Sequence, residues 1–212
     1  MSSPFAHMTP PAASFRFHDF RLERRGFLTV YSISDDHRRW DIVERGHAAA
    51  VLPVDWARRE VYLVEQPRYV LAFEHPEVSR RLEDPTAEVT GTVGQIMSLE
   101  TPSGMLEPGE APLAAAVREL KEETGIELTP DRFTEVCCYF ASIGALTETT
   151  RCYLADVPEG FTHAEPQGDG DEHIAVWRVP FEEFFTALET GRIRAASAVI
   201  LAQELRYRAN GV

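Results

Sequence analysis

The sequence has little of three things: long apolar runs, cysteine and positive charge. None of its apolar stretches approaches the roughly 20 residues that a membrane-spanning helix needs, so we expect no membrane-embedded segment. The first residues, MSSPFAHMTPPAASF, lack a basic start followed by an apolar stretch, which argues against a secretory signal and predicts a cytoplasmic protein. Their proline, alanine and serine content predicts a flexible tail over residues 1–14.

The three cysteines, Cys137, Cys138 and Cys152, match no spacing that is typical of a metal site. We expect buried, reduced thiols that pack as small hydrophobic groups. Cys137 and Cys138 are neighbours in a predicted strand, and their side chains should therefore point to opposite faces.

Positive charge is scarce, because 21 Lys and Arg residues face 34 Asp and Glu residues and the formal net charge is −13. Binding to a nucleic-acid backbone requires a surplus of basic side chains, so the charge argues against such a partner. A small anionic substrate stays possible, since divalent cations held by carboxylates can reverse the local sign of a site.

At 212 residues and 44% hydrophobic composition, the chain is long enough for one domain with a well-buried core and an extension. Short β-prone pieces predict an N-terminal β extension over residues 15–45, followed by a catalytic domain over residues 46–212. The charged stretch 74–95 is expected to be a surface excursion with a short helix around residues 76–82. Strands are expected at 27–34, 40–43, 47–52, 60–66, 96–101, 133–141, 149–157 and 174–179, and helices at 111–124, 180–190 and 195–208. This order predicts an α/β (α+β) sandwich in which helices cover a mixed sheet.

The strongest predicted helix lies within residues 104–126, GMLEPGEAPLAAAVRELKEETGI, and Gly125 is suited to end it. At 100° per residue, one apolar stripe is formed by Leu113, Val117 and Leu120. Nearly opposite lies an acidic cluster formed by Glu119, Glu122 and Glu123.

Three like charges within one helical turn repel one another, so we expect a compensating group. Mg²⁺ and Mn²⁺ prefer oxygen ligands and leave room for substrate phosphates, and Glu119 and Glu123 lie one turn apart as such a site requires. Arg118 is expected to fix the loop before the helix by pairing with Glu110 or Glu122.

A glutamate-rich amphipathic helix is usually no more than a solvated surface. The whole segment, however, fits G-x5-E-x7-R-E-U-x-E-E-x-G-U at every fixed position, where U is a bulky apolar residue. It therefore resembles the Nudix box. This resemblance implies the Nudix α/β/α sandwich and hydrolysis of a nucleoside diphosphate linked to another group. It also implies divalent metals on Glu119 and Glu123, with Glu122 as a further ligand or a catalytic residue beside Arg118.

Segments outside the box resemble the bacterial ADP-ribose pyrophosphatases from about residue 26 to residue 205. They are VERGHAA (43–49), VEQPR (64–68), ETPSGMLE (100–107), ASIGALTE (141–148), ETGRI (189–193) and AASAVI (195–200). The implied reaction is cleavage of a nucleoside diphosphate sugar, with ADP-ribose giving AMP and ribose 5-phosphate as the first substrate to test. GDP-mannose or another nucleotide sugar is the nearest alternative. A nucleoside triphosphate hydrolase is more distant, and a non-catalytic nucleotide-binding module or a dimeric scaffold would be a different class of protein.

The same resemblance implies a homodimer whose N-terminal sheets are exchanged, with Phe27 stacked on the adenine of the partner's substrate. The alternative for Phe27 is an ordinary core residue of a strand. Arg45, Arg68, Met105 and Glu148 correspond to residues that contact substrate. For the two arginines, a plain surface ion pair is the alternative.

Two further expectations concern the metal and the catalytic base. The backbone carbonyl of Ser103 corresponds to a metal ligand, and Glu172 corresponds to an acid on a late loop that serves the metal and the attacking water. Gly170 stands where the family has glutamate, so the base is left open among Glu172, Asp171, Asp169 and Glu122.

Overall fold

A computed structural model of the chain describes residues 18–35, 38–74, 94, 96–159, 161 and 174–211. These residues divide into two compact units. The first comprises the described residues within Met1–Arg45 and Ser142–Glu148, and the second those within Gly46–Ala141 and Thr149–Val212. The tail expected at 1–14 and the helix expected at 76–82 lie outside the described residues.

The first unit contains a three-stranded antiparallel sheet of β1 (His18–Arg24), β2 (Thr29–Ser34) and β3 (Arg39–Glu44). Val43 on β3 also holds the returning loop, because its N–H donates to the carbonyl of Ala145 at 2.8 Å and its carbonyl accepts from Thr147 at 3.0 Å. Strand β2 begins two residues later than the sequence predicts, since the chain bends at residues 26–28.

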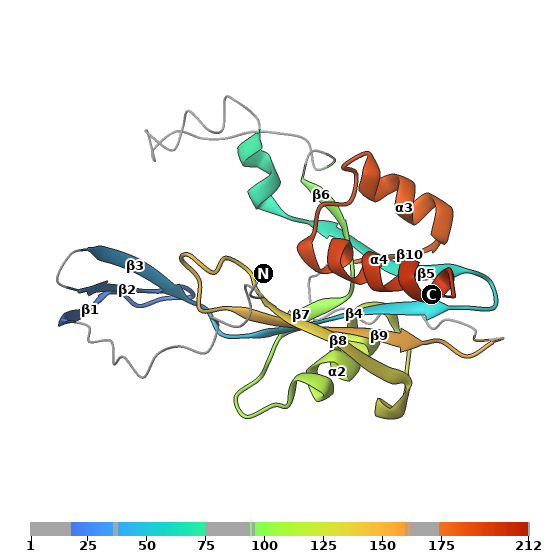
Figure 1. The fold of residues 1–212 in the computed structure, drawn as a ribbon, viewed down its shortest axis with the longest axis horizontal. Coiled ribbons are helices and arrows are strands. Elements are labelled where there is room, and N and C mark those ends of the chain that lie inside the picture. The colour runs from blue at the N-terminus through green and yellow to red at the C-terminus, as the bar shows by residue number, and fades with distance from the viewer. Residues whose placement is uncertain are drawn as a thin grey trace, which may run out of the picture. The chain divides into compact units, whose positions relative to one another are not determined.

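The second unit is built on a seven-stranded sheet (Figure 1). Its main path runs in the order β10 (Ala175–Pro180), β5 (Glu60–Pro67), β4 (Ala48–Asp55), β9 (Thr149–Asp156) and β8 (Phe133–Phe140). Strand β6 (Met97–Glu100) pairs with β5, and β7 (Ser103–Met105) pairs with β4. The pairing of β4 with β9 is parallel and the other pairings are antiparallel, which makes the sheet mixed.

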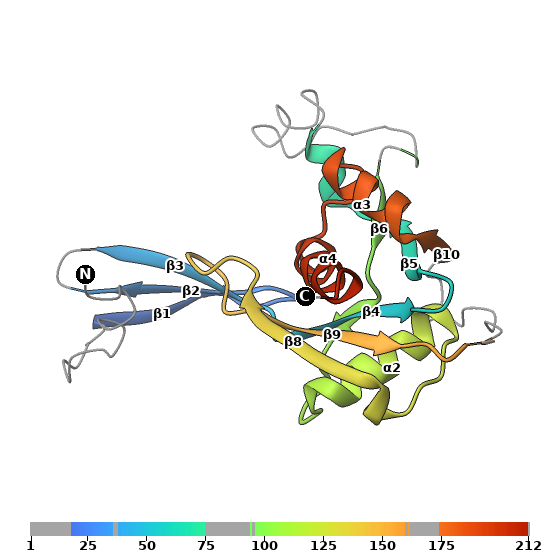
Figure 2. The ribbon, with the colours of Figure 1, turned by 45° about the vertical axis from the view of Figure 1, so that its right-hand side comes forward.

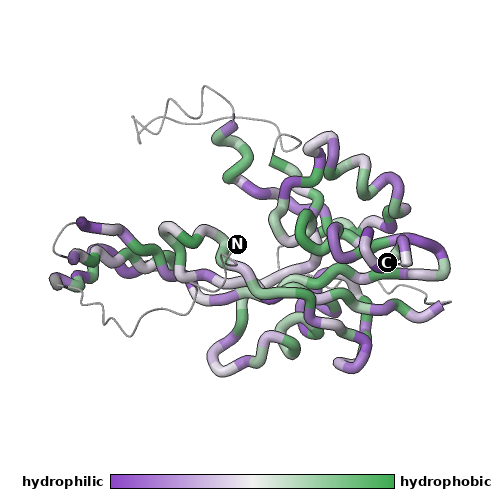
Figure 3. The backbone as a smooth tube through the Cα atoms, in the orientation of Figure 1, coloured by the Kyte–Doolittle hydropathy of each residue, from purple (hydrophilic) through white to green (hydrophobic). Residues whose placement is uncertain are grey.

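Helices cover both faces of this sheet (Figures 1 and 2). On one side lies α2 (Pro112–Thr124), and on the other lie α3 (Phe181–Glu189) and α4 (Ala196–Ala209). Each face of the sheet packs against its helices in a separate hydrophobic core. Successive side chains of β4 alternate between the two cores, since Leu52 packs with the α3 and α4 residues whereas Val51 packs with those of α2. Figure 3 shows hydrophobic residues running along the strands of this sheet. The arrangement confirms the predicted α/β/α sandwich with a mixed sheet.

Three further details differ from the sequence prediction. Strand β4 continues through Pro53 to Asp55, where a loop was expected, and β7 forms a short strand in the expected lead-in loop. Cys152 is buried and Cys137 is partly buried, but Cys138 is exposed, so the expectation of buried thiols is wrong for Cys138.

Two 3-10 helices, η2 (Tyr69–Glu74) and η5 (Pro130–Arg132), are also present. Among the described residues, no helix is both long enough and apolar enough to cross a membrane.

Candidate active site

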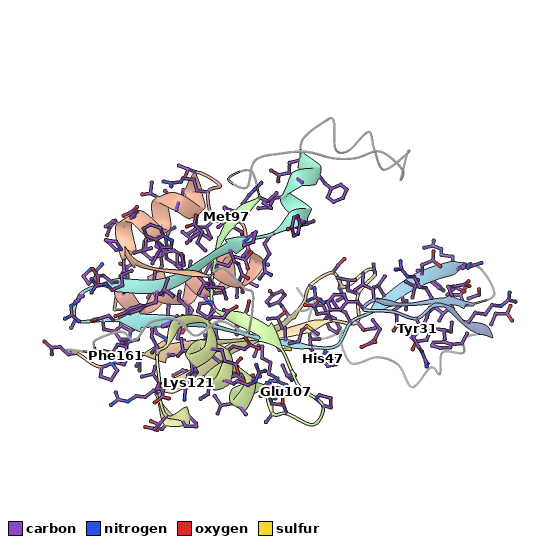
Figure 4. The ribbon with its side chains drawn as sticks, turned by 180° about the vertical axis from the view of Figure 1, so that it is seen from behind. Tyr31, His47, Met97, Glu107, Lys121 and Phe161 are labelled. Atoms are coloured by element: carbon purple, nitrogen blue, oxygen red, sulfur yellow. The ribbon has the colours of Figure 1, made fainter. Side chains whose placement is uncertain are left out.

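Helix α2 carries most of the charged groups of the site, and Figure 4 labels Lys121 on it and Glu107 in the loop before it. The helix begins at Pro112, whose missing N–H would be unpaired at that position anyway. It ends where Gly125 adopts a left-handed φ of 70°. Its fully buried apolar residues are Ala115, Ala116 and Leu120. Val117, which the sequence placed in the apolar stripe, is only partly buried.

Arg118 connects the acidic groups of the site, because its guanidinium donates hydrogen bonds to three carboxylates and one carbonyl. Its Nε and Nη2 donate to the two oxygens of Glu110, each at 2.9 Å. Its Nη1 donates to Glu119 at 2.7 Å and to Glu122 at 2.9 Å, and Nη2 also reaches the carbonyl of Met105 at 3.0 Å. The sequence left Glu110 and Glu122 open as partners, and Arg118 bonds both. These hydrogen bonds, led by that to Glu110, raise the pKa of Arg118.

Glu110 joins the loop to the helix. Besides Arg118, its carboxylate accepts the backbone N–H of Glu107 at 2.9 Å. The hydrogen bond from Arg118 is the largest cause that lowers the pKa of this carboxyl. The carboxylate of Glu110 therefore ties the loop before α2 to the helix.

Glu119 is held in a confined position. Burial raises the pKa of its carboxyl, while the hydrogen bond from Arg118 opposes that shift. An ideal Cβ on Gly104 would lie 1.9 Å from its Oε1. The carboxylate thus fits only because residue 104 has no side chain.

Glu123 lies deeper, with 7% of its surface exposed. Its Oε2 accepts the backbone N–H of Ser103 at 2.9 Å. Ser103 is paired with Ala50 in the ladder between β7 and β4, so this bond ties the acidic face of α2 to the sheet. Glu123 and Ser103, both expected at a metal site, are therefore in direct contact.

The donor chemistry of this region fits a hard divalent cation. Three carboxylates, those of Glu110, Glu119 and Glu122, meet at the guanidinium of Arg118, and Glu123 lies on the same helix, so this region is rich in the oxygen donors that such a cation prefers. Within the described residues, no three His, Cys, Asp or Glu side chains already converge as a metal site. Glu119 and Glu122 turn toward Arg118, and they would have to reorient to meet a cation.

Arg68 lies just after β5 and forms a two-pronged ion pair with Glu100 at the end of β6. Its Nε is 3.1 Å and 3.2 Å from the two carboxylate oxygens, and its Nη2 donates at 2.8 Å. The side chain of Arg68 is 41% exposed, whereas that of Glu100 is 12% exposed. The sequence predicted a substrate contact for Arg68 but did not reveal Glu100 as its partner. That partner follows only from the register in which β5 pairs with β6.

Three of the other expected substrate residues belong to the first unit, whereas Met105 lies on β7 in the second. Arg45 lies 3.3 Å from a carboxylate oxygen of Glu148, and its guanidinium lies 5.9 Å from the ring centroid of Phe27. Phe27 is 84% exposed in the bend before β2, so the alternative that it is a core strand residue is wrong. The structure thus groups Phe27, Arg45 and Glu148 in one unit and the box residues in the other.

Glu172, Asp171 and Asp169 lie outside the described residues. Sequence reasoning also passed over His47, whose Nδ1 lies 2.9 Å from the hydroxyl of Thr149 and whose carbonyl accepts the N–H of Leu106 at 2.9 Å. The sequence placed His47 at the start of the predicted strand 47–52 without a role, and in the structure it directly precedes β4.

Comparison with known proteins agrees with the fold and with the box. A model of the family described as "NUDIX domain" matches residues 44–201, more than half of the chain. The ADP-ribose pyrophosphatase of Escherichia coli (strain K12) is 34% identical over 194 residues, which cover 86% of this chain and 83% of that protein.

Two further relatives carry related names. The GDP-mannose pyrophosphatase of Cronobacter sakazakii is 28% identical over 172 residues, covering 81% of this chain and 79% of the relative. The ADP-ribose pyrophosphatase of Bacillus subtilis (strain 168) is 30% identical over 110 residues, covering 52% of this chain and 58% of the relative.

Proposed function

Because the chain belongs to the NUDIX domain family, we propose that it hydrolyses the pyrophosphate bond of a nucleoside diphosphate sugar in a divalent-metal-dependent reaction. ADP-ribose is the first proposed substrate, and its products are AMP and ribose 5-phosphate. The observation that carries this proposal is the box itself, in which Arg118 organises Glu110, Glu119 and Glu122 while Glu123 bonds Ser103.

Each box residue has a proposed task. Glu119, Glu123 and the carbonyl of Ser103 would hold the metal, with Glu122 as a further ligand, and Mg²⁺ or Mn²⁺ suits such oxygen donors. A cation bound there supplies charge neutralisation for the diphosphate and an oriented water. Arg118 keeps the glutamates in position, since one planar guanidinium already spans three of them.

The bond that breaks joins phosphorus to the bridging oxygen, and the oxygen of water forms the new bond to phosphorus. A base must take the proton of that water. We propose Glu172 for this task, with Asp171, Asp169 and Glu122 as the other candidates. Arg68 would place its guanidinium beside the diphosphate, where charge-assisted hydrogen bonds are strong.

The remaining substrate contacts are proposed for Phe27, Arg45, Met105 and Glu148. Phe27 presents an exposed ring, as stacking on a base requires. The homodimer with exchanged N-terminal sheets, the cytoplasmic location and the absence of a nucleic-acid partner are likewise predictions from the sequence.

A second candidate substrate is GDP-mannose, because the chain is similar over four fifths of its length to relatives of that name. The test is a comparison of kcat/KM for ADP-ribose, GDP-mannose, UDP-glucose and a nucleoside triphosphate, with products identified by chromatography. The proposal expects ADP-ribose to be the best substrate by about tenfold or more. A preference for GDP-mannose would support the proposed reaction but replace ADP-ribose as the proposed substrate. Absence of turnover with every compound would contradict the proposal and favour a binding module.

A further inference from the structure

Gln66 is a buried polar residue whose amide nitrogen has no hydrogen-bond partner among the residues that the structure describes. It lies near the end of β5 and is 6% exposed. Its Nε2 is fully buried and has no partner within the described part of the chain. A buried amide that donates to nothing destabilises a protein, so its retention here calls for an explanation.

The strand register puts Gln66 on the same strand face as the ion pair between Arg68 and Glu100. Gln66 lies opposite Ser98, and Glu100 lies opposite Val64, two residues earlier on β5. Residues two apart share a face of a strand, so Gln66 and Glu100 are diagonal neighbours within reach of long side chains.

Arg68 continues the same register, because its N–H donates to the carbonyl of Ile96 at 2.6 Å. To reach Glu100, its side chain must therefore run back along the face over the row formed by Gln66 and Ser98. The two-pronged ion pair and the amide of Gln66 therefore share one face of β5 and β6.

Movement of Arg68 toward an anion would have a consequence for Glu100. The side chain of Glu100 is 12% exposed, and its carboxylate accepts charge-assisted hydrogen bonds from both Nε and Nη2 of Arg68. A largely buried carboxylate that loses its cation is strongly disfavoured. Release of Arg68 is therefore easier if another donor on the same face can take its place, and the amide of Gln66 is such a donor.

We propose that Gln66 is a positioning residue that takes over the carboxylate of Glu100 when Arg68 turns to the diphosphate of a nucleotide sugar. The inference rests on the proposed function, since it needs an anionic substrate for Arg68. The unpartnered donor in the free protein becomes a hydrogen-bonded one in the complex, and this difference favours substrate binding.

Gln66→Met tests the inference, because it removes the amide and nearly preserves the side-chain volume. Binding of ADP-ribose to the full chain in the presence of a chelator is measured by calorimetry, together with KM, kcat and the melting temperature. We expect the dissociation constant and KM to rise about tenfold, since a hydrogen bond to a charged group is lost only in the complex. The value of kcat should stay within about twofold, and the melting temperature should not fall because no hydrogen bond is lost in the free protein.

Two further variants sharpen the test. Gln203→Met makes the same change at an exposed position of α4 and should leave all four quantities unchanged. In an Arg68→Met background no ion pair has to open, so adding Gln66→Met should change the dissociation constant by no more than about twofold.

A lower melting temperature or loss of folding in Gln66→Met would overturn the inference, because the amide would then have a partner in the free protein. So would wild-type affinity in that variant, or equal effects of Gln66→Met in the two backgrounds. These results differ from failure of the proposed function, in which the wild-type chain itself would neither bind nor cleave any nucleotide sugar.

Discussion

The carboxylate of Glu119 occupies the space that a side chain at Gly104 would need. An ideal Cβ at position 104 would approach its Oε1 to 1.9 Å and its Cδ to 2.1 Å. The backbone of Gly104 has no left-handed φ, so the restriction is one of space around the carboxylate.

Gly104→Ala should therefore displace Glu119 without straining the backbone. We expect kcat to fall about a hundredfold, because a displacement of about 1 Å in a metal-binding group has effects of that order. The matched control is Gly94→Ala, where a Cβ would meet no atom of the described residues within 4 Å. Steady-state kinetics check this prediction, and near-wild-type kcat in Gly104→Ala would show that the position of Glu119 does not matter.

Arg118→Lys should reduce kcat more than it changes KM. A lysine keeps the charge, but its single ammonium cannot bond Glu110, Glu119, Glu122 and the carbonyl of Met105 together. We expect a loss in kcat of about a hundredfold. Arg132→Lys, at an exposed arginine of η5, is the control. Equal kcat in both variants would mean that charge alone is sufficient at position 118.

The thiols should differ in their reactivity toward a disulfide reagent at pH 8. Burial raises the pKa of Cys152 to about 12, so almost none of this residue is in the nucleophilic thiolate form at pH 8. Desolvation also raises the pKa of Cys137. Cys138 is exposed. We expect one fast-reacting thiol, lost in Cys138→Ser, with the others reacting only after unfolding. Rapid modification of Cys152 in the native protein would contradict this packing of β9.

The sheet of β1, β2 and β3 should form part of a subunit interface. Phe20 is 65% exposed and Leu22 is 48% exposed on β1, and exposed apolar groups in one small unit are typical of interaction surfaces. Sedimentation should give a dimer for the wild-type chain. The double change Phe20→Ser and Leu22→Ser should give a monomer with an unchanged circular dichroism spectrum. A monomeric wild type at micromolar concentration would refute the predicted homodimer.

Local features of the fold were predictable from the sequence. Helix α2 was expected at 111–124 and is observed at Pro112–Thr124, because its helix-forming residues end at a glycine that adopts the left-handed conformation. Short runs of apolar residues, Val61–Val64 and Cys152–Ala155, likewise marked β5 and β9. These elements depend on residues within a few positions of one another.

Features that depend on distant residues were not predictable. The parallel pairing of β4 with β9 joins residues about a hundred positions apart, and no local pattern encodes that choice. Strand β7 is three residues long, too short to show a period. It nevertheless decides where Ser103 meets Glu123 and where Gly104 meets Glu119.

The same limit applied to the site. The spacing of the box predicted its glutamates and its arginine, since all lie on one helix and its leading loop. The pairing of Arg68 with Glu100 and the unpartnered amide of Gln66 follow from the register of β5 with β6, which the sequence did not reveal.

The most direct test of the account is release of AMP from ADP-ribose by the wild-type chain and by Glu123→Gln, each with Mg²⁺ and with a chelator. The substitution nearly preserves the side-chain shape and removes the charge of a carboxylate that is 7% exposed and bonded to Ser103. The account predicts rapid cleavage by the wild type with Mg²⁺, none with chelator, and a loss of at least about a thousandfold in kcat for Glu123→Gln. Equal cleavage by the two proteins, or cleavage that persists in chelator, would contradict the assignment of catalysis to the glutamates of α2.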